Sequence, residues 1–222
     1  MATLADLWPF FGLRARQGDL ELHAVRDEDL PELVALVLDG VHDPVRMPFS
    51  VPWTDATPAE LPRRYLAHYW AQRSEMSVER WSLDLVVRRD GTAVGIQGIS
   101  TQNFLVTRTG ETGSWLGRRF QGQGIGTRMR QAVCALAFDH LGFEEVTSAA
   151  FTDNPQSLNV SRKVGYRENG ERRVQRREGE CATSRGLVLV PESFVRADEP
   201  LVVEGAAAVR RFLGIEGSAA QG

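Results

Sequence analysis

The chain has 222 residues, of which 42% are hydrophobic, and a formal net charge of −3 at pH 7. This length and composition allow one sizeable hydrophobic core, and the slightly acidic balance excludes a general nucleic-acid-binding protein. The 2 cysteines lack metal-ligand spacing, so we expect reduced thiols and no metal site. Without a signal-peptide pattern or a membrane-length apolar run, a cytoplasmic protein with no membrane partner is expected.

Hydrophobic periodicity and turn residues predict five elements in the first half of the chain. They are a strand over 20–25, a helix ending near residue 38, a helix over 58–73, and strands over 81–88 and 93–100 joined by a hairpin turn at Asp90-Gly91. The segment 42–57, between the two helices, is rich in proline and aromatic residues. It has no periodicity, so we expect a loop there.

The second half of the chain continues the mixture of strands and helices. Its predicted elements are strands over 111–116, 145–151, 168–177 and 182–190, a long helix over 125–141 and a short helix beginning at Pro155. This order predicts an α+β fold with a mixed sheet.

The composition changes near residue 198. Residues 203–213 are predicted to form a short helix, and the small, polar residues 216–222 are predicted to be disordered. We therefore divide the chain into one domain, 1–197, and a helical extension with a flexible tail, 198–222. The helix either packs on the domain, which we favour, or joins two copies in a homodimer.

The most informative segment connects the fourth predicted strand to the long helix. It consists of Gln121, Gly122, Gln123, Gly124, Ile125, Gly126 and Thr127. Glycines at a strand-to-helix turn let the backbone approach a ligand, and the N–H groups of the helix start favour a phosphate. A P-loop is excluded because no lysine follows Gly126, and the glycine spacing differs from that of dinucleotide-binding folds.

A second motif follows 28 residues after Gly126. Asn154 can cap the helix that Pro155 begins, and Gly165, before Tyr166, suits the left-handed residue that ends it. In isolation this segment would be an ordinary, well-capped helix.

Read as Gln121-x-x-Gly124-x-Gly126, the glycine loop resembles the pyrophosphate loop of the GNAT superfamily of acyl-CoA-dependent N-acyltransferases. The second motif is similar to that superfamily's asparagine after the fifth strand and its Gly-Phe or Gly-Tyr pair. Together they look most like the RimJ/RimL branch, over roughly residues 13–192. The resemblance implies a GNAT-type three-layer fold with a central mixed, mostly antiparallel, splayed sheet flanked by helices.

The resemblance also implies an acyl-CoA co-substrate, either acetyl-CoA or another such as succinyl-CoA, with its pantetheine arm between the splayed strands. The residues carried over as its binding site are Trp115, Leu116, Gly117, Gln121, Gly122, Gln123, Gly124, Ile125, Gly126, Thr127, Asn154, Ser157 and Ser161. Arg128, Arg130 and Arg162 are predicted to reach the CoA phosphates.

Acyl transfer to an amine requires a proton acceptor for the amine and a proton donor for the departing thiolate. Ser161 stands seven residues after the asparagine, where many GNAT enzymes have a tyrosine, so a hydroxyl donor remains; Ser157 is the alternative. Glu111, at the start of the fourth strand, is our first candidate for the base, before His42 and Asp43.

In the GNAT arrangement the loop over 42–57 faces the thioester, so we predict that it lines the acceptor pocket. Its candidate acceptor-binding residues are His42, Asp43, Met47, Phe49 and Trp53. The alternative is that its aromatic residues are core packing beneath an ordinary loop.

We therefore predict an enzyme, foremost an N-acetyltransferase, that transfers the acyl group to a primary amine of a small molecule or peptide. The amine would attack directly in a ternary complex. The alternatives are a succinyl-CoA-dependent N-acyltransferase, a protein N-terminal acetyltransferase and a non-catalytic acyl-CoA-binding sensory module.

Overall fold

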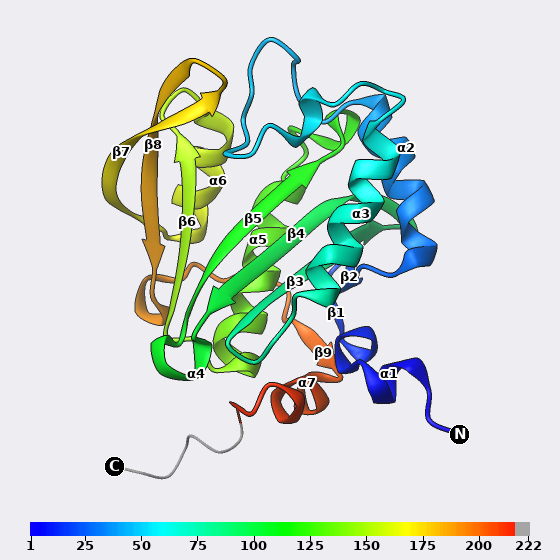
Figure 1. The fold of residues 1–222 in the computed structure, drawn as a ribbon. Coiled ribbons are helices and arrows are strands. Elements are labelled where there is room, and N and C mark those ends of the chain that lie inside the picture. Colours follow the sequence, from blue (N-terminus) through cyan, green and yellow to red (C-terminus); the bar gives the residue numbers. More distant parts are fainter. Residues whose placement is uncertain (216–222) are drawn as a thin grey trace.

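The structure, a computed structural model, describes residues 1–215. It contains one nine-stranded sheet with helices on both faces (Figure 1). The strands are β1 (Arg14–Gln17), β2 (Leu20–Ala24), β3 (Arg80–Arg89), β4 (Thr92–Gln102), β5 (Thr109–Leu116), β6 (Glu145–Phe151), β7 (Arg167–Arg177), β8 (Glu180–Leu189) and β9 (Val202–Glu204). The α-helices are α1 (Leu4–Leu7), α2 (Leu30–Asp39), α3 (Leu61–Ser74), α4 (Phe104–Thr107), α5 (Ile125–Ala135), α6 (Pro155–Val164) and α7 (Ala206–Phe212).

The strand order is β7-β8-β6-β5-β4-β3-β2-β1-β9. Neighbouring strands are antiparallel except β5 and β6, which are parallel. The predicted α+β fold with a central, mixed and mostly antiparallel sheet is therefore confirmed.

The molecule has three layers because side chains alternate between the two faces of each strand. On one face Val86 and Ile96 pack with Leu33 of α2 and Tyr65 of α3. On the other face the alternate residues of the same strands, such as Leu85 and Ile99, join the core beneath α5. Figure 1 shows α2 and α3 on one side of the sheet and α5 on the other.

The sheet splays between β5 and β6. Backbone pairing joins Thr109–Glu111 to Glu145–Thr147 and then stops, although β5 continues to Leu116 and β6 to Phe151. Beyond this point side chains replace the ladder: Thr112 Oγ1 donates to Thr147 O at 3.1 Å, and Ser148 Oγ donates to Thr112 O at 3.1 Å. One edge of β5 over 112–116 is thus left without a strand neighbour.

Local signals correctly predicted several turns and caps. Asp90 and Gly91 both have positive φ, 52° and 76°, in the hairpin between β3 and β4. Asn154 Oδ1 accepts from Ser157 N at 3.2 Å at the start of α6, and Gly165, at φ 100°, ends that helix. The long helix also forms, but its last turn and a half, 136–141, is π-helical.

Two strands at one end of the sheet, β1 and the edge strand β9, were not predicted. β1 is mostly polar in sequence, and β9 takes the first residues of the helix predicted over 203–213, so that α7 begins at Ala206. β1 pairs with β2 on one side and with β9 on the other, and β9 forms through this contact between distant parts of the chain. Val209 and Leu213 are buried in the main core, so the C-terminal helix packs on the domain.

The tail predicted over 216–222 lies outside the described residues. Within residues 1–215, the helices are too short or too polar to span a bilayer. No group of three or more His, Cys, Asp or Glu side chains in the same range is placed to hold a metal ion.

Candidate active site

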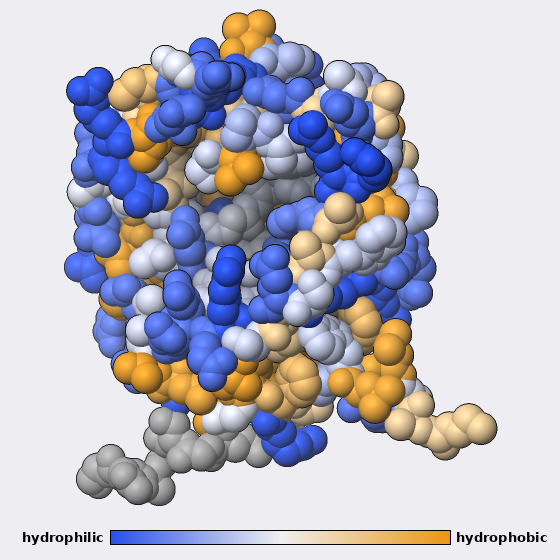
Figure 2. Space-filling view, in the orientation of Figure 1, coloured by the Kyte–Doolittle hydropathy of each residue, from blue (hydrophilic) through white to orange (hydrophobic). Residues whose placement is uncertain are grey.

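A cavity of about 540 Å³ lies beneath α3 and the 42–57 loop, above β3, β4 and β5. Figure 2, in the orientation of Figure 1, shows this face hollowed near its centre, with hydrophilic residues around much of the rim. The floor is the part of the sheet next to the splay. The cavity therefore adjoins the unpaired part of β5.

The floor consists of three rows of residues that cross β3, β4 and β5 on one face of the sheet, as the strand register dictates. The rows are Ser82, Ser100 and Glu111; Asp84, Gly98 and Gly113; and Val86, Ile96 and Trp115. One outer row is polar and the other is apolar. The middle row has a carboxylate at one end and two glycines without side chains, so it forms an open lane across the sheet.

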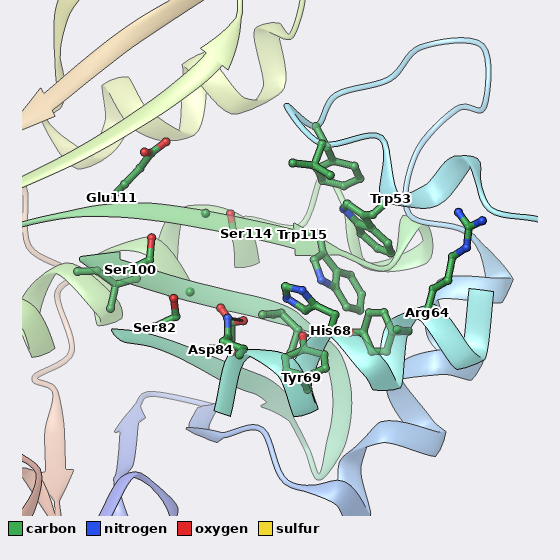
Figure 3. A pocket seen from close by; sticks show the side chains of 18 of the residues that line it. Trp53, Arg64, His68, Tyr69, Ser82, Asp84, Ser100, Glu111, Ser114 and Trp115 are labelled. Atoms are coloured by element: carbon green, nitrogen blue, oxygen red, sulfur yellow. Dashed lines mark hydrogen bonds between the residues drawn. The ribbon is translucent and has the colours of Figure 1, made fainter. Parts of the chain in front are cut away.

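Aromatic rings form the wall above the apolar row. Trp53 lies 5.1 Å from Phe49, 5.9 Å from Tyr65 and 6.1 Å from Trp115 between ring centroids. These rings come from the loop, α3 and β5. Such apolar walls with few polar groups are typical of small-molecule pockets. Figure 3 shows the rings at one side of the cavity, with Glu111 and Ser100 at the other.

Asp84 is the polar group at the centre of the floor, and the sequence analysis missed it. Gln72 Nε2 of α3 donates to Asp84 Oδ2 at 3.1 Å. Burial raises the pKa of the Asp84 carboxyl, while the bond from Gln72 and the nearby His68 oppose that shift. In the sequence Asp84 and Ser82 occupy alternate positions between the apolar residues of the strand, and polar residues at such positions usually face solvent.

Of the predicted acceptor-side residues, the structure places Phe49, Trp53 and Glu111 around the cavity. Glu111 is exposed at the edge of the floor. The other three, His42, Asp43 and Met47, are not among the lining residues. His42 Nε2 bonds Thr54 Oγ1 at 2.7 Å, Asp43 Oδ1 accepts from Val45 N, and Met47 is 1% exposed.

The glycine loop lies at the end of β5 and leads into α5. Gly122 and Gly124 have φ of 74° and 80°, and a Cβ added at either would meet no atom within 4 Å. The space above the loop is therefore open. The N–H groups of Ile125 and Gly126, at the start of α5, have no backbone partner within residues 1–215 and suit an anion, whereas Thr127 N already donates to Gly124 O at 3.1 Å.

The glutamines of the loop fix its shape. Gln121 Nε2 donates to Val41 O at 2.7 Å and to Leu116 O at 3.0 Å, and Gln123 Nε2 donates to Arg119 O at 2.9 Å. These side chains hold the loop against the ends of β5 and α2. Their amide nitrogens are thus engaged with the protein's own backbone.

Two of the arginines that were predicted to reach CoA phosphates, Arg128 and Arg130, bind other residues of the protein instead. Arg128 forms an ion pair with Asp19. Arg130 is 4% exposed and donates to Gln97, Ser114 and Ser148 on the far side of the sheet. Helix periodicity placed these residues near the loop, but it did not show that they face the core and a neighbouring turn.

Ser161 is 1% exposed on α6, and its Oγ has no hydrogen-bond partner within residues 1–215. The half-buried Ser157 lies one turn earlier and gives its backbone N–H to Asn154. A buried hydroxyl without a partner is uncommon in proteins and calls for an explanation such as a bound ligand or water.

The 42–57 loop is tied to the β7–β8 hairpin. Arg177 Nε donates to Asp55 Oδ2 at 2.7 Å, and its NH2 group donates to Asp55 Oδ1 at 2.9 Å and to Pro44 O at 3.0 Å. This bidentate pair joins the loop, which lies on one side of the splay, to a hairpin on the other side. The bond lowers the pKa of Asp55.

Replacing Arg177 by alanine is therefore expected to loosen the loop and to raise the KM for the acceptor, with little change in CoA affinity. Arg185→Ala is the matched control, because Arg185 lies on the same hairpin but pairs with Glu168 and Glu171. Steady-state kinetics of both variants give the comparison. Equal acceptor KM values in the two variants would contradict a role for the Arg177 tie.

A splayed sheet with a glycine loop at a helix start and a pocket beside the splay is the arrangement of the GNAT acyltransferases. Residues 19–167 match the family model described as "Acetyltransferase (GNAT) domain". The chain therefore belongs to this family, and the resemblance found in the sequence is confirmed.

Two solved structures have the same fold. Mycobacterium smegmatis RimJ in complex with CoA-disulfide is 20% identical, with a TM-score of 0.66 and 93% of each chain covered. Spermidine N-acetyltransferase from Vibrio cholerae in complex with CoA and spermine is 14% identical, with a TM-score of 0.59, covering 79% of this chain and 97% of that one.

Among curated proteins, the chain is similar to the Bacillus subtilis protein named "Putative ribosomal N-acetyltransferase YdaF". The two are 33% identical over 85 residues, which are 38% of this chain. The matched region spans 45% of that relative's length, less than half of it.

Proposed function

We propose that the protein transfers an acetyl group from acetyl-CoA to a primary amine of a small molecule or peptide. The observation that carries this proposal is that one strand, β5, borders both the splay and the cavity. β5 has a backbone edge without a strand neighbour and leads into the glycine loop, while the same strand forms part of the cavity floor through Gly113 and Trp115. A thioester held along β5 would thus face an amine in the cavity.

The donor would be held by backbone rather than by charged side chains. The edge of β5 over 112–116, which has no strand neighbour, suits the amide groups of a pantetheine arm, and the open space above Gly122 and Gly124 suits a pyrophosphate. Gly117, just beyond β5, already donates its N–H to Val94 O at 2.9 Å. A bound acyl-CoA supplies the activated acyl group. The residues of the chain would orient the two substrates, exclude water and accept or donate protons.

Direct attack in a ternary complex is favoured over a covalent acyl-enzyme. Cys134 is buried beneath the sheet, and burial raises the pKa of its thiol to about 11. Cys181 lies on β8 and does not line the cavity. The chain has 2 cysteines, so neither offers a reactive thiolate beside the acceptor.

An acetyl donor is favoured over a succinyl donor by charge. The floor of the cavity holds two carboxylates, Asp84 and Glu111, which would repel the free carboxylate of a succinyl group. The arginine at the cavity, Arg64, is largely exposed and lies 3.6 Å from Glu60. An exposed guanidinium that is already close to a carboxylate is a weak partner for the carboxylate of a succinyl group.

The test is thiol release from acetyl-CoA and from succinyl-CoA with a panel of small amines and short peptides bearing free N-termini. Turnover with acetyl-CoA and an amine supports the proposal. CoA binding without turnover with any acceptor would instead favour a non-catalytic sensory module.

Replacing Trp53 by alanine is expected to raise the acceptor KM or to change the order of preferred acceptors, while CoA affinity stays unchanged. The reason is that Trp53 packs against three other rings of the wall. Trp70→Ala is the control, since Trp70 is 51% exposed on α3 and does not line the cavity. A Trp53 variant that only loses stability, with the same acceptor profile, would place Trp53 in the core.

A further inference from the structure

One carboxylate oxygen of Asp84 accepts a hydrogen bond, and the other has no donor within residues 1–215. Oδ2 accepts from Gln72, whereas Oδ1 has no donor within residues 1–215. Asp84 also lines the cavity, so that the free oxygen is available to a ligand. Figure 3 shows the carboxylate in the middle of the floor, between the aromatic wall and the polar row.

The neighbouring strand makes room for this carboxylate. Gly98 lies directly across from Asp84 on β4, and a Cβ at that position would overlap Asp84 Oδ1. The carboxylate thus lies over β4, toward the centre of the sheet. Any side chain at position 98 would displace it.

The same row leads to the strand that would hold the thioester. Gly113 of β5 lies across from Gly98, and a Cβ at Gly113 would meet no atom within 4 Å. Adjacent strands are about 4.8 Å apart, so the carboxylate over Gly98 lies roughly one strand spacing from β5. An amine above the lane could contact Asp84 directly or through one water molecule.

We propose that Asp84 binds the acceptor as an ammonium ion and takes its proton before attack, so that the pocket selects primary amines that enter as cations. This inference rests on the function proposed above. A proton moves from the ammonium nitrogen to Asp84 Oδ1, and the neutral amine attacks the thioester carbonyl carbon. The C–N bond forms and the C–S bond breaks. The second nitrogen proton goes to the departing thiolate, directly or by way of a hydroxyl such as that of Ser161, and the Asp84 proton passes to solvent.

The surroundings of Asp84 suit this task. Desolvation raises its pKa, which brings a carboxylate closer to the range in which a base is effective at neutral pH. The groups facing it from α3 are His68, Gln72, Tyr65 and Tyr69, and burial keeps both tyrosine hydroxyls neutral by raising their pKa. Arg73, which also acts on Tyr69, is paired with Asp27. On the sheet, Glu111 is the other charged group lining the cavity.

Glu111 is the alternative that the sequence favoured. It occupies the polar row, two positions along β5 from Gly113, and it is exposed. An exposed carboxylate is well hydrated and gains little from a cationic ligand. The two carboxylates can be distinguished because both have isosteric amide replacements.

The experiment compares Asp84→Asn with Glu111→Gln, using the best amine of the panel and measuring kcat/KM against pH. Asp84→Asn is expected to lower kcat/KM about a hundredfold or more at pH 7, and to lower it much further than Glu111→Gln does. The loss should shrink above the pKa of the acceptor amine, where the amine is already neutral. CoA affinity should not change in either variant.

Gly98→Ala is the second variant, because it retains the carboxylate but displaces it. It should reproduce the loss in kcat/KM, and it decides the question if Asp84→Asn does not fold. A wild-type profile in Asp84→Asn, or a loss that does not recover at high pH, would overturn the proposal. Wild-type protein that shows no turnover with any amine would instead count against the proposed function itself.

Discussion

Replacing Gly124 by valine is expected to raise the dissociation constant for CoA about tenfold or more, which corresponds to about 1.4 kcal/mol. Gly124 has φ of 80°, a conformation that a β-branched residue rarely adopts. Its missing side chain also leaves open the space in which we place the pyrophosphate. The substitution would therefore both fill this space and turn the N–H groups at the start of α5. Calorimetric titration with CoA measures the effect.

Gly170 provides a matched control. It also has φ of 80°, and a Cβ there would meet no atom within 4 Å, but it lies on β7 away from the loop. Gly170→Val should cost backbone strain of the same kind and leave CoA affinity unchanged. Unchanged affinity in a folded Gly124 variant would contradict the assignment of the loop to the pyrophosphate.

Replacing Ser161 by alanine is expected to lower kcat about tenfold to a hundredfold, with CoA affinity nearly unchanged, if Ser161 donates the proton to the departing thiolate. The position of Ser161 allows an effect on catalysis to be separated from an effect on folding. Because Ser161 Oγ has no partner within residues 1–215, its removal breaks no hydrogen bond of the described fold. The melting temperature should therefore be maintained, and a loss of kcat would report on the chemistry.

The possible outcomes for Ser161 are distinct. A fall in CoA affinity with kcat retained would show that the hydroxyl binds the donor. If both parameters hold, the hydroxyl has neither role. Ser157→Ala serves as the comparison, because it tests the alternative hydroxyl on the same helix, one turn away and half-buried.

The sequence by itself determined the parts of the molecule whose chemistry is local. The turn at Asp90-Gly91 and the caps at Asn154 and Gly165 depend on the conformations that a few adjacent residues allow, and all three are present. The glycine loop belongs to the same class, since the missing side chains of Gly122 and Gly124 permit the positive φ that both residues adopt. These local motifs sufficed to indicate the family, and the binding site for the donor that they predict remains a prediction.

Which residues line the cavity was decided by tertiary structure. The loop 42–57 shows no periodicity, so the sequence could not separate Phe49 and Trp53, which line the cavity, from Met47, which is buried elsewhere. The tie between Arg177 and Asp55 joins residues that are 122 positions apart. Which loop residues face the cavity depends on such distant contacts.

The position of Asp84 shows most clearly what the sequence alone could not predict. Counted straight from the hairpin turn, where Arg89 pairs with Thr92, the register would place Asp84 across from Gln97. A bulge between Val87 and Arg88 shifts the pairing by one residue and places Asp84 across from Gly98 instead. A shift of one residue turns every side chain beyond it to the opposite face of the sheet. The open lane therefore depends on one irregularity in backbone pairing, which packing on both faces of the sheet selects and local sequence preference does not.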